Sequence, residues 1–283
     1  MQRIAVIGGG QMGAGIAEVS ARAGCDVVVV EADEDGAERF RARLEKSLQR
    51  AASSGRISAE DADAAFARVE VATSLEGAVH ADLVIEAAPE VEALKLDLFR
   101  RLDEILPTDA ILASNTSSIP LVKMASVTKR PDKVVGVHFF NPAPVLPLVE
   151  VVASLLTSDE TLAAVTAFAE DQLGKTTIRS KDRAGFIVNA LLIPYLLSAI
   201  RMMESGFASA EDIDAGMVQG CAHPQGPLAL ADLIGLDTTA AVAQSMYEEF
   251  KEPLYAPPPL LLRMVDAGLL GRKTGRGFFP YSR

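Results

Sequence analysis

The feature that most constrains the fold is a glycine cluster placed directly after a short apolar strand. Residues 4–7 read Ile-Ala-Val-Ile, and residues 8–13 read Gly-Gly-Gly-Gln-Met-Gly, which fits the spacing G-x-G-x-x-G. A helix is expected over residues 12–23, and a second strand over residues 27–30 delivers Glu31 about 20 residues after the cluster. This order of strand, glycine turn, helix, strand and acidic residue predicts a dinucleotide-binding unit.

Each residue of the cluster has a physical task in holding a dinucleotide. Gly8 permits the tight turn, Gly10 lets the backbone approach a pyrophosphate, and Gly13 lets the helix pack closely on the strand. The start of the helix, at Gln11 and Met12, presents backbone N–H groups to the phosphates. We therefore expect these five residues to contact the cofactor.

Glu31 distinguishes between two cofactors. A carboxylate accepts hydrogen bonds from the adenosine ribose hydroxyls, whereas it would repel a 2′-phosphate, and the following Ala32 and Asp33 offer no Arg for such a phosphate. The sequence thus predicts NAD and not NADP. The alternative, a βαβ unit with accidental glycines, is disfavoured by the combined context.

Short Val, Ile and Leu runs alternate with helix-length segments through the first half of the chain. The expected strands are residues 4–7, 27–30, 83–85, 110–113, 134–137 and 148–152. The alternation implies an α/β fold with a parallel sheet and right-handed crossovers. Beyond a linker at residues 181–185 the pattern is helical. We expect a Rossmann-like dinucleotide-binding domain over residues 1–183 and an all-α dimerisation domain over residues 184–283.

Charge and composition narrow the partners. The net charge of -11 and the absence of a long Lys/Arg run disfavour nucleic acid. The most apolar segment, residues 190–200, is about half the length that crosses a bilayer, and no leader precedes the first strand. Cys25 and Cys221 are too few for a disulfide framework or a metal cluster, and both are expected to be core thiols. These features predict a cytoplasmic protein with no metal and no membrane or nucleic-acid partner.

Five further motifs follow in order along the chain. They are residues 82–88 (Asp-Leu-Val-Ile-Glu-Ala-Ala), 113–118 (Ala-Ser-Asn-Thr-Ser-Ser), 137–142 (Val-His-Phe-Phe-Asn-Pro), 185–189 (Gly-Phe-Ile-Val-Asn) and 271–278 (Gly-Arg-Lys-Thr-Gly-Arg-Gly-Phe). The whole chain closely resembles the 3-hydroxyacyl-CoA dehydrogenases, especially the short bacterial 3-hydroxybutyryl-CoA dehydrogenases. The resemblance implies a homodimer that reversibly oxidises an (S)-3-hydroxyacyl-CoA with NAD, with the substrate between its two domains.

The resemblance places the family's catalytic pair on His138 and Glu150. An imidazole suits a base that takes the hydroxyl proton as hydride leaves carbon, and a carboxylate orients the ring and stabilises imidazolium. From the residues alone, His138 ends an apolar strand, where a core histidine is as common as a base. Glu150 lies in an apolar strand, so either it has a buried partner or the strand is an edge facing water.

The same matching assigns substrate and cofactor contacts. Ser117 and Asn189 correspond to residues that polarise the substrate, although Ser117 alone also fits ordinary loop or cap chemistry. Asn189, in an apolar helix start, is expected to be buried with partners. The matched NAD contacts are Glu90, Lys95, Ser117, Asn141 and Lys273. Without the resemblance each would pass as a surface residue, with Lys95 on a solvated helix and Lys273 in a disordered tail.

One segment departs from the family pattern. Where relatives meet the thioester nucleotide with lysines, residues 50–56 read Arg-Ala-Ala-Ser-Ser-Gly-Arg. Arg50 and Arg56 remain as expected substrate contacts, but two serines replace lysines, so a carrier-protein thioester is an alternative to CoA. A free hydroxy acid is a further alternative substrate. An inactive NAD-binding protein is disfavoured because the four residues matched to catalysis are all present.

Overall fold

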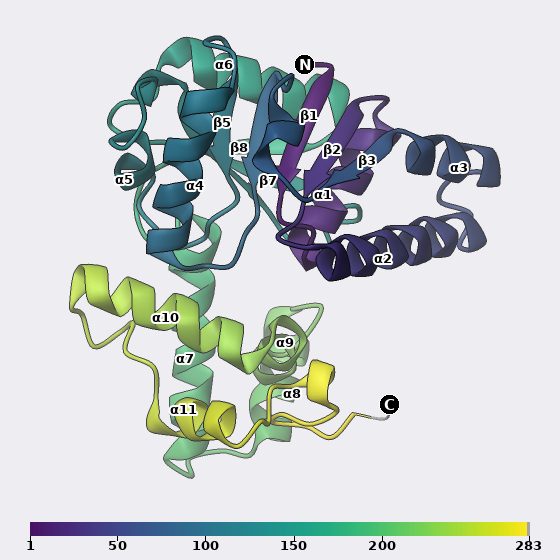
Figure 1. Ribbon diagram of the computed structural model, residues 1–283. Coiled ribbons are helices and arrows are strands. Elements are labelled where there is room, and N and C mark those ends of the chain that lie inside the picture. The colour runs from purple at the N-terminus through teal and green to yellow at the C-terminus, as the bar shows by residue number, and fades with distance from the viewer. Residues whose placement is uncertain (282–283) are drawn as a thin grey trace. The chain divides into compact units, whose positions relative to one another are not determined.

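Strands and helices alternate in the N-terminal part of the computed structural model, and helices alone build most of the C-terminal part (Figure 1). The structure describes residues 1–281, and residues 282 and 283, the last two of the predicted second domain, lie outside the described residues. The chain divides into two compact units, Met1–Asp182 and Arg183 onward. Each unit has its own hydrophobic core.

The first unit contains one sheet of eight strands in the order β3-β2-β1-β4-β5-β6-β7-β8. The strands are β1 (Arg3–Ile7), β2 (Asp26–Val30), β3 (Val69–Ala72), β4 (Leu83–Glu86), β5 (Ile111–Ser114), β6 (Val134–Phe139), β7 (Leu148–Ala153) and β8 (Thr176–Lys181). Only β6 and β7 pair antiparallel. The chain leaves β1 first toward β2 and later toward β4, so the carboxyl ends of β1 and β4 flank a switch point. Open α/β sheets bind ligands at such a point.

Several helices of the first unit begin at a side chain that caps their free N–H groups. The helices of this unit are α1 (Gln11–Arg22), α2 (Glu34–Ser53), α3 (Ala59–Ala67), α4 (Glu92–Ile105), α5 (Leu121–Ala125) and α6 (Asp159–Ala167), with short helical turns at Leu75–Ala78, Pro131–Lys133 and Phe168–Gln172. Asp33 caps α2 by accepting from the N–H of Gly36 at 2.7 Å. Ser58 and Asp61 form a capping box at the start of α3.

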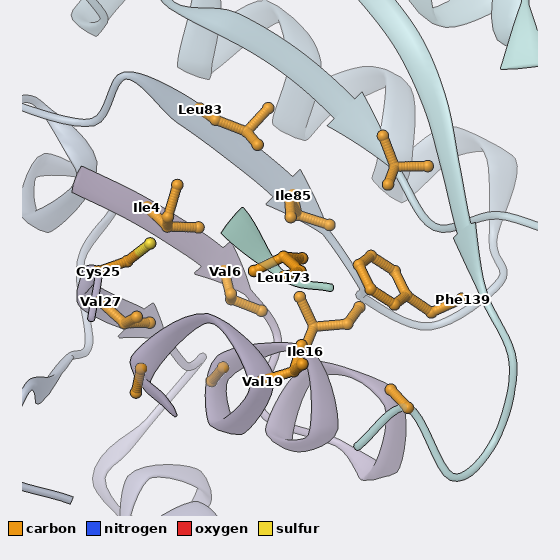
Figure 2. Close-up of a cluster of buried hydrophobic side chains, with 14 of the residues drawn as sticks. Ile4, Val6, Ile16, Val19, Cys25, Val27, Leu83, Ile85, Phe139 and Leu173 are labelled. Carbon is orange, nitrogen blue, oxygen red and sulfur yellow. The ribbon is translucent and has the colours of Figure 1, made fainter. Parts of the chain in front are cut away.

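Figure 2 shows how α1 packs on β1. Ile4 of the strand and Ile16 of the helix are both buried in the same core cluster. Gly13 permits the close approach, because a Cβ there would lie 1.8 Å from the carbonyl oxygen of Gly8. Full burial of such an aliphatic side chain contributes about 1.5–3 kcal/mol. This packing fixes the start of α1 at the carboxyl end of β1.

The described part of the second unit, residues 183–281, contains five α-helices and a folded tail. The helices are α7 (Val188–Glu204), α8 (Ala210–Cys221), α9 (Pro227–Ile234), α10 (Leu236–Phe250) and α11 (Pro259–Asp266), with a turn at Arg272–Thr274. The buried Asp232 accepts from the N–H groups of Phe278 and Phe279 and from the Tyr281 hydroxyl, each at 3.0 Å. Burial and this hydrogen bond raise the pKa of Tyr281 to about 12. None of the helices described in either unit is both long and apolar enough to cross a membrane.

The predicted fold class is confirmed, with corrections in detail. β3 and β8 were not expected, and both are edge strands with mostly half-buried or exposed side chains, so no apolar run marks them. The sheet is not wholly parallel, because residues 140–147 between β6 and β7 are too few for a parallel crossover of about a dozen residues. Cys25 is buried as expected, but Cys221 is exposed and not a core thiol.

Candidate active site

The glycine loop and Glu31 line one cavity at the carboxyl ends of β1 and β2. The cavity has a volume of about 440 Å³ and is lined by Gly8, Gly10, Gln11, Met12, Glu31, Gly36, Arg39, Arg43, Ala87, Ala88 and Pro89. Gly8 has a φ of +96°, and a Cβ on Gly10 would meet nothing within 4 Å. Gly10 is the N-cap of α1, and no described side chain caps the first turn. The open approach and the uncapped helix start fit a pyrophosphate beside an adenosine ribose.

Gly9 is held from both sides. Its N–H donates to Glu31 Oε1 at 2.8 Å, and its carbonyl accepts from the Arg43 guanidinium at 2.6 Å. A Cβ on Gly9 would lie 2.6 Å from the Phe40 ring. Glu31 and α2 therefore fix the middle of the glycine loop. Nothing in the sequence marks Arg39 or Arg43 for this place, since α2 is rich in charged residues along its whole length.

A buried ion pair lies at the carboxyl end of β4. The Lys95 Nζ is 2.6 Å from Glu86 Oε1 and 3.1 Å from Glu90 Oε2, and the side chains of Lys95 and Glu86 are 1% and 0% exposed. Lys95 is thus not on a solvated helix face, and that reading is wrong. The structure brings the predicted Lys95 and Glu90 into direct contact and adds Glu86, which was not among the predicted site residues. The signal available for Glu86 was a carboxylate ending an otherwise apolar strand.

Glu90 connects this ion pair to the loop after β5. Its Oε1 accepts from the N–H of Ser117 at 3.1 Å, from the Ser118 hydroxyl at 2.8 Å and from the Thr116 hydroxyl. Burial alone would raise the pKa of Glu90, but the Lys95 ammonium and the two hydroxyls outweigh burial and hold this pKa below its usual value. The backbone of Ser117 is therefore fixed by an ionised carboxylate.

β6 and β7 present a histidine and a glutamate opposite each other. The strand register pairs His138 with Glu150, and Nδ1 of the ring lies 2.8 Å from Glu150 Oε2. The two side chains are 8% and 0% exposed, so Glu150 has a buried partner and does not face water. The carboxylate favours the tautomer with its proton on Nδ1, which leaves the acceptor lone pair on Nε2. Among the described residues, no three or more His, Cys, Asp or Glu side chains gather as a metal site.

Three other predicted residues of the first unit lie near its surface. Asn141 accepts from the Gln11 amide at 3.2 Å, which links the end of β6 to the start of α1. Arg50 and Arg56 are exposed at the far end of α2, and Arg50 lies about 25 Å along the helix from its start. The structure does not bring the two arginines to the cavity of Glu31, and their contact with a thioester nucleotide stays a prediction.

Two predicted residues belong to the second unit. Asn189 lies in the first turn of α7 and is half-buried, less than the buried amide expected. The Lys273 ammonium pairs with both carboxylate oxygens of Asp237 in the first turn of α10. The tail that carries Lys273 is folded, because Asp232 binds it at Phe278 and Phe279. Their roles toward substrate and cofactor stay predictions.

Two family profiles match almost the whole chain. The profile described as 3-hydroxyacyl-CoA dehydrogenase, NAD binding domain, matches residues 3–183, and that described as the C-terminal domain matches residues 185–281. The chain belongs to the 3-hydroxyacyl-CoA dehydrogenase family. It is an NAD-dependent 3-hydroxyacyl-CoA dehydrogenase, and the glycine loop, Glu31 and the buried pair on β6 and β7 all lie in its NAD-binding part.

Individual members of this dehydrogenase family resemble the chain over its full length. It is 55% identical over 282 residues to a 3-hydroxybutyryl-CoA dehydrogenase from Mycobacterium tuberculosis, with 99% of both sequences covered. The crystal structure of FadB2 from M. tuberculosis superposes with a TM-score of 0.98 at 54% identity, covering 100% of this chain and 99% of that one. An (S)-3-hydroxybutyryl-CoA dehydrogenase from Ralstonia eutropha, PaaH1, gives 0.93 at 45% identity, with both chains fully covered. The predicted family and its use of NAD are confirmed.

Proposed function

We propose that this dehydrogenase interconverts (S)-3-hydroxybutyryl-CoA, or a similarly short 3-hydroxyacyl-CoA, and its 3-ketoacyl-CoA, with His138 as the base. The short acyl chain is supported by the names of relatives that match over the full length. The observation that carries the chemical assignment is the buried pair of His138 and Glu150, with Nδ1 and Oε2 2.8 Å apart at the ligand-binding edge of the sheet.

The alcohol loses two hydrogens in different forms. When bound, NAD supplies the acceptor for the hydride, which leaves C3 with the electron pair of the C–H bond. The hydroxyl proton goes to Nε2 of His138, and the oxygen forms the ketone with C3. Glu150 accepts from Nδ1–H, so it keeps the ring in the productive tautomer and stabilises the imidazolium. In the reverse direction His138 returns the proton to the ketone oxygen.

The loop after β5 supplies a hydrogen bond to the reacting oxygen. We assign this to the Ser117 hydroxyl, because the Ser117 backbone is anchored on Glu90 and Glu90 on the buried Lys95. Glu90 and Asn141 are proposed contacts of the nicotinamide half of the cofactor, since they follow the carboxyl ends of β4 and β6. Lys95, on α4, is proposed to act on the cofactor through Glu90, because its own side chain is 1% exposed. Asn189 and Lys273 are proposed to act from the second unit, on the substrate and the cofactor respectively.

The second unit is the proposed dimerisation domain. Leu191 and Leu233, on α7 and α9, expose 73% and 50% of their surface, and Phe207 exposes 79%. Apolar side chains exposed to this degree favour a surface covered by a partner, here a second copy of the chain. Static light scattering measures the expected dimer mass. Both cysteines are free thiols, in line with a cytoplasmic location.

The decisive test follows NADH consumption with acetoacetyl-CoA in the wild type and in His138→Gln. We expect rapid turnover by the wild type and a kcat lower by about 10²–10⁴-fold in the variant, because the general base is lost. The matched control is His80→Gln, since His80 is exposed on the same unit and has no proposed role. Full turnover by His138→Gln would contradict the assignment, and wild-type activity on acetoacetyl carrier protein alone would favour the other thioester.

A further inference from the structure

The cavity beside Glu31 is lined by two arginines in addition to the glycine loop. Three charged side chains line it, namely Glu31, Arg39 and Arg43. The two arginines are four residues apart on α2, so they lie on one face of that helix. Because α2 begins directly after β2, this face stands next to the carboxylate expected to meet the adenosine ribose.

We propose that Arg39 and Arg43 form a site for the 2′-phosphate of NADP, and that the carboxylate of Glu31 alone excludes NADP from it. The proposal rests on the proposed placement of the adenosine ribose at Glu31. A carboxylate accepts hydrogen bonds from ribose hydroxyls but repels a phosphate, whereas paired guanidinium groups bind phosphate well. None of the residues directly after Glu31 is an arginine, but Arg39 and Arg43 of α2 line the same cavity as Glu31.

Glu31 occupies the space that a phosphate would need. Its Oε1 accepts from the N–H of Gly9 at 2.8 Å, and a Cβ on Gly36 would lie 3.0 Å from Oε2. The carboxylate thus fills the gap between the glycine loop and the start of α2. Replacing Glu31 with Gln keeps the size and an acceptor for Gly9 and removes only the charge, whereas Ser also opens the gap.

The two arginines are held in ways that leave them able to bind phosphate. Arg43 donates through one guanidinium nitrogen to the Gly9 carbonyl at 2.6 Å, which anchors it at the rim of the cavity. Arg39 lies 4.0 Å from Asp33 Oδ1, and both side chains are about two-thirds exposed. Such an exposed pair contributes little free energy, so Arg39 is readily redirected to a phosphate. Asp33 itself is engaged as the cap that binds the Gly36 N–H.

Calorimetric titration of the full-length protein with NADH and with NADPH tests the proposal without turnover. We expect the wild type to prefer NADH, Glu31→Gln to narrow the preference, and Glu31→Ser to bind NADPH at least about tenfold more tightly than the wild type. In the Glu31→Ser background, Arg39→Ala should remove most of this gain and change NADH affinity less than about threefold. Arg43→Ala also removes the donor to the Gly9 carbonyl, so it should weaken both cofactors but NADPH more than NADH. Arg41→Ala is the matched control, because Arg41 is exposed on α2 and does not line the cavity.

Each contrary result identifies what fails. Unchanged NADPH affinity in both Glu31 variants, with weaker NADH binding, overturns the phosphate site while the placement of the adenosine stands. If the arginine substitutions weaken NADH and NADPH equally, the arginines serve the pyrophosphate common to both cofactors, and the proposal is refuted. If the Glu31 variants bind NADH as the folded wild type does, the adenosine does not lie at Glu31, and the placement fails together with the proposal.

Discussion

Two glutamates at the ligand-binding edge of the sheet have the same burial and different partners. Glu86, at the end of β4, and Glu150, on β7, are both 0% exposed. Glu86 pairs with the Lys95 ammonium at 2.6 Å, and Glu150 pairs with the His138 imidazole at 2.8 Å. Burial alone therefore does not separate a carboxylate that anchors a loop from the one that we propose positions the base.

The partner makes the difference. The Lys95 ammonium uses its three N–H donors on Glu86, on Glu90 and on the Ala88 carbonyl at 3.2 Å, so it fixes the positions of these groups. An imidazole has a second nitrogen that exchanges a proton near neutral pH. We infer that the cluster around Lys95 positions the loop of Ser117, while the pair of His138 and Glu150 moves the proton.

The largest expected effect tests the pair of His138 and Glu150. In Glu150→Gln the amide can donate to Nδ1 and hold the wrong tautomer, so we expect kcat to fall by about 10³-fold while the protein remains folded. Steady-state kinetics with acetoacetyl-CoA and NADH measure the change. Glu70→Gln, an exposed glutamate on strand β3, is the control and should keep wild-type kcat. If kcat of Glu150→Gln falls by less than about threefold, Glu150 does not assist proton transfer and does not differ from Glu86 in role.

The next effect tests the cluster of Glu86, Glu90 and Lys95 through the free energy of unfolding. Lys95→Met leaves Glu86 buried without its cation, so the free energy of unfolding should fall by about 3–5 kcal/mol. Urea denaturation measures the loss, and the double variant Glu86→Gln with Lys95→Met should recover much of it because the fully buried charge at position 86 is gone as well. We expect the double variant to stay impaired in turnover, because Glu90 has lost the ammonium that positions it. Recovery of turnover with stability would show that the cluster has only a structural role.

The smallest expected effect is the pH dependence of the stability that Glu90 contributes. The pKa of Glu90 is held below its usual value of 4.5, so its charge stabilises the fold above that pH and the contribution is lost as pH falls through the lower folded-state value. Glu90→Gln should therefore be less stable than the wild type at about pH 7, and the difference should shrink at about pH 4. Thermal unfolding at the two pH values measures it. A difference that stays constant would mean that Glu90 contributes by packing and not by charge.

The pair of His138 and Glu150 and the cluster around Lys95 also show which features could be predicted from the sequence and which could not. The glycine spacing and Glu31 were recognisable because a dinucleotide needs those residue types in that order, and the fold class followed from the alternating strands. His138 and Glu150 were assigned by resemblance, but their direct pairing depends on the antiparallel register of β6 and β7, which was not expected. The burial of Lys95 was not predicted from the sequence, because its partner Glu86 belongs to another element. Contacts between different elements depend on how those elements pack, which the pattern within one element does not determine.

The most direct test of the account compares kcat for alcohol oxidation and the free energy of unfolding in the wild type, Glu150→Gln and Glu86→Gln. Glu150→Gln should show the larger loss of kcat, because the amide can hold His138 in the wrong tautomer. Glu86→Gln should show the larger loss of unfolding free energy, because Lys95 then keeps a buried charge without its nearest carboxylate. The reverse order of the two effects would contradict the division of roles between the two glutamates.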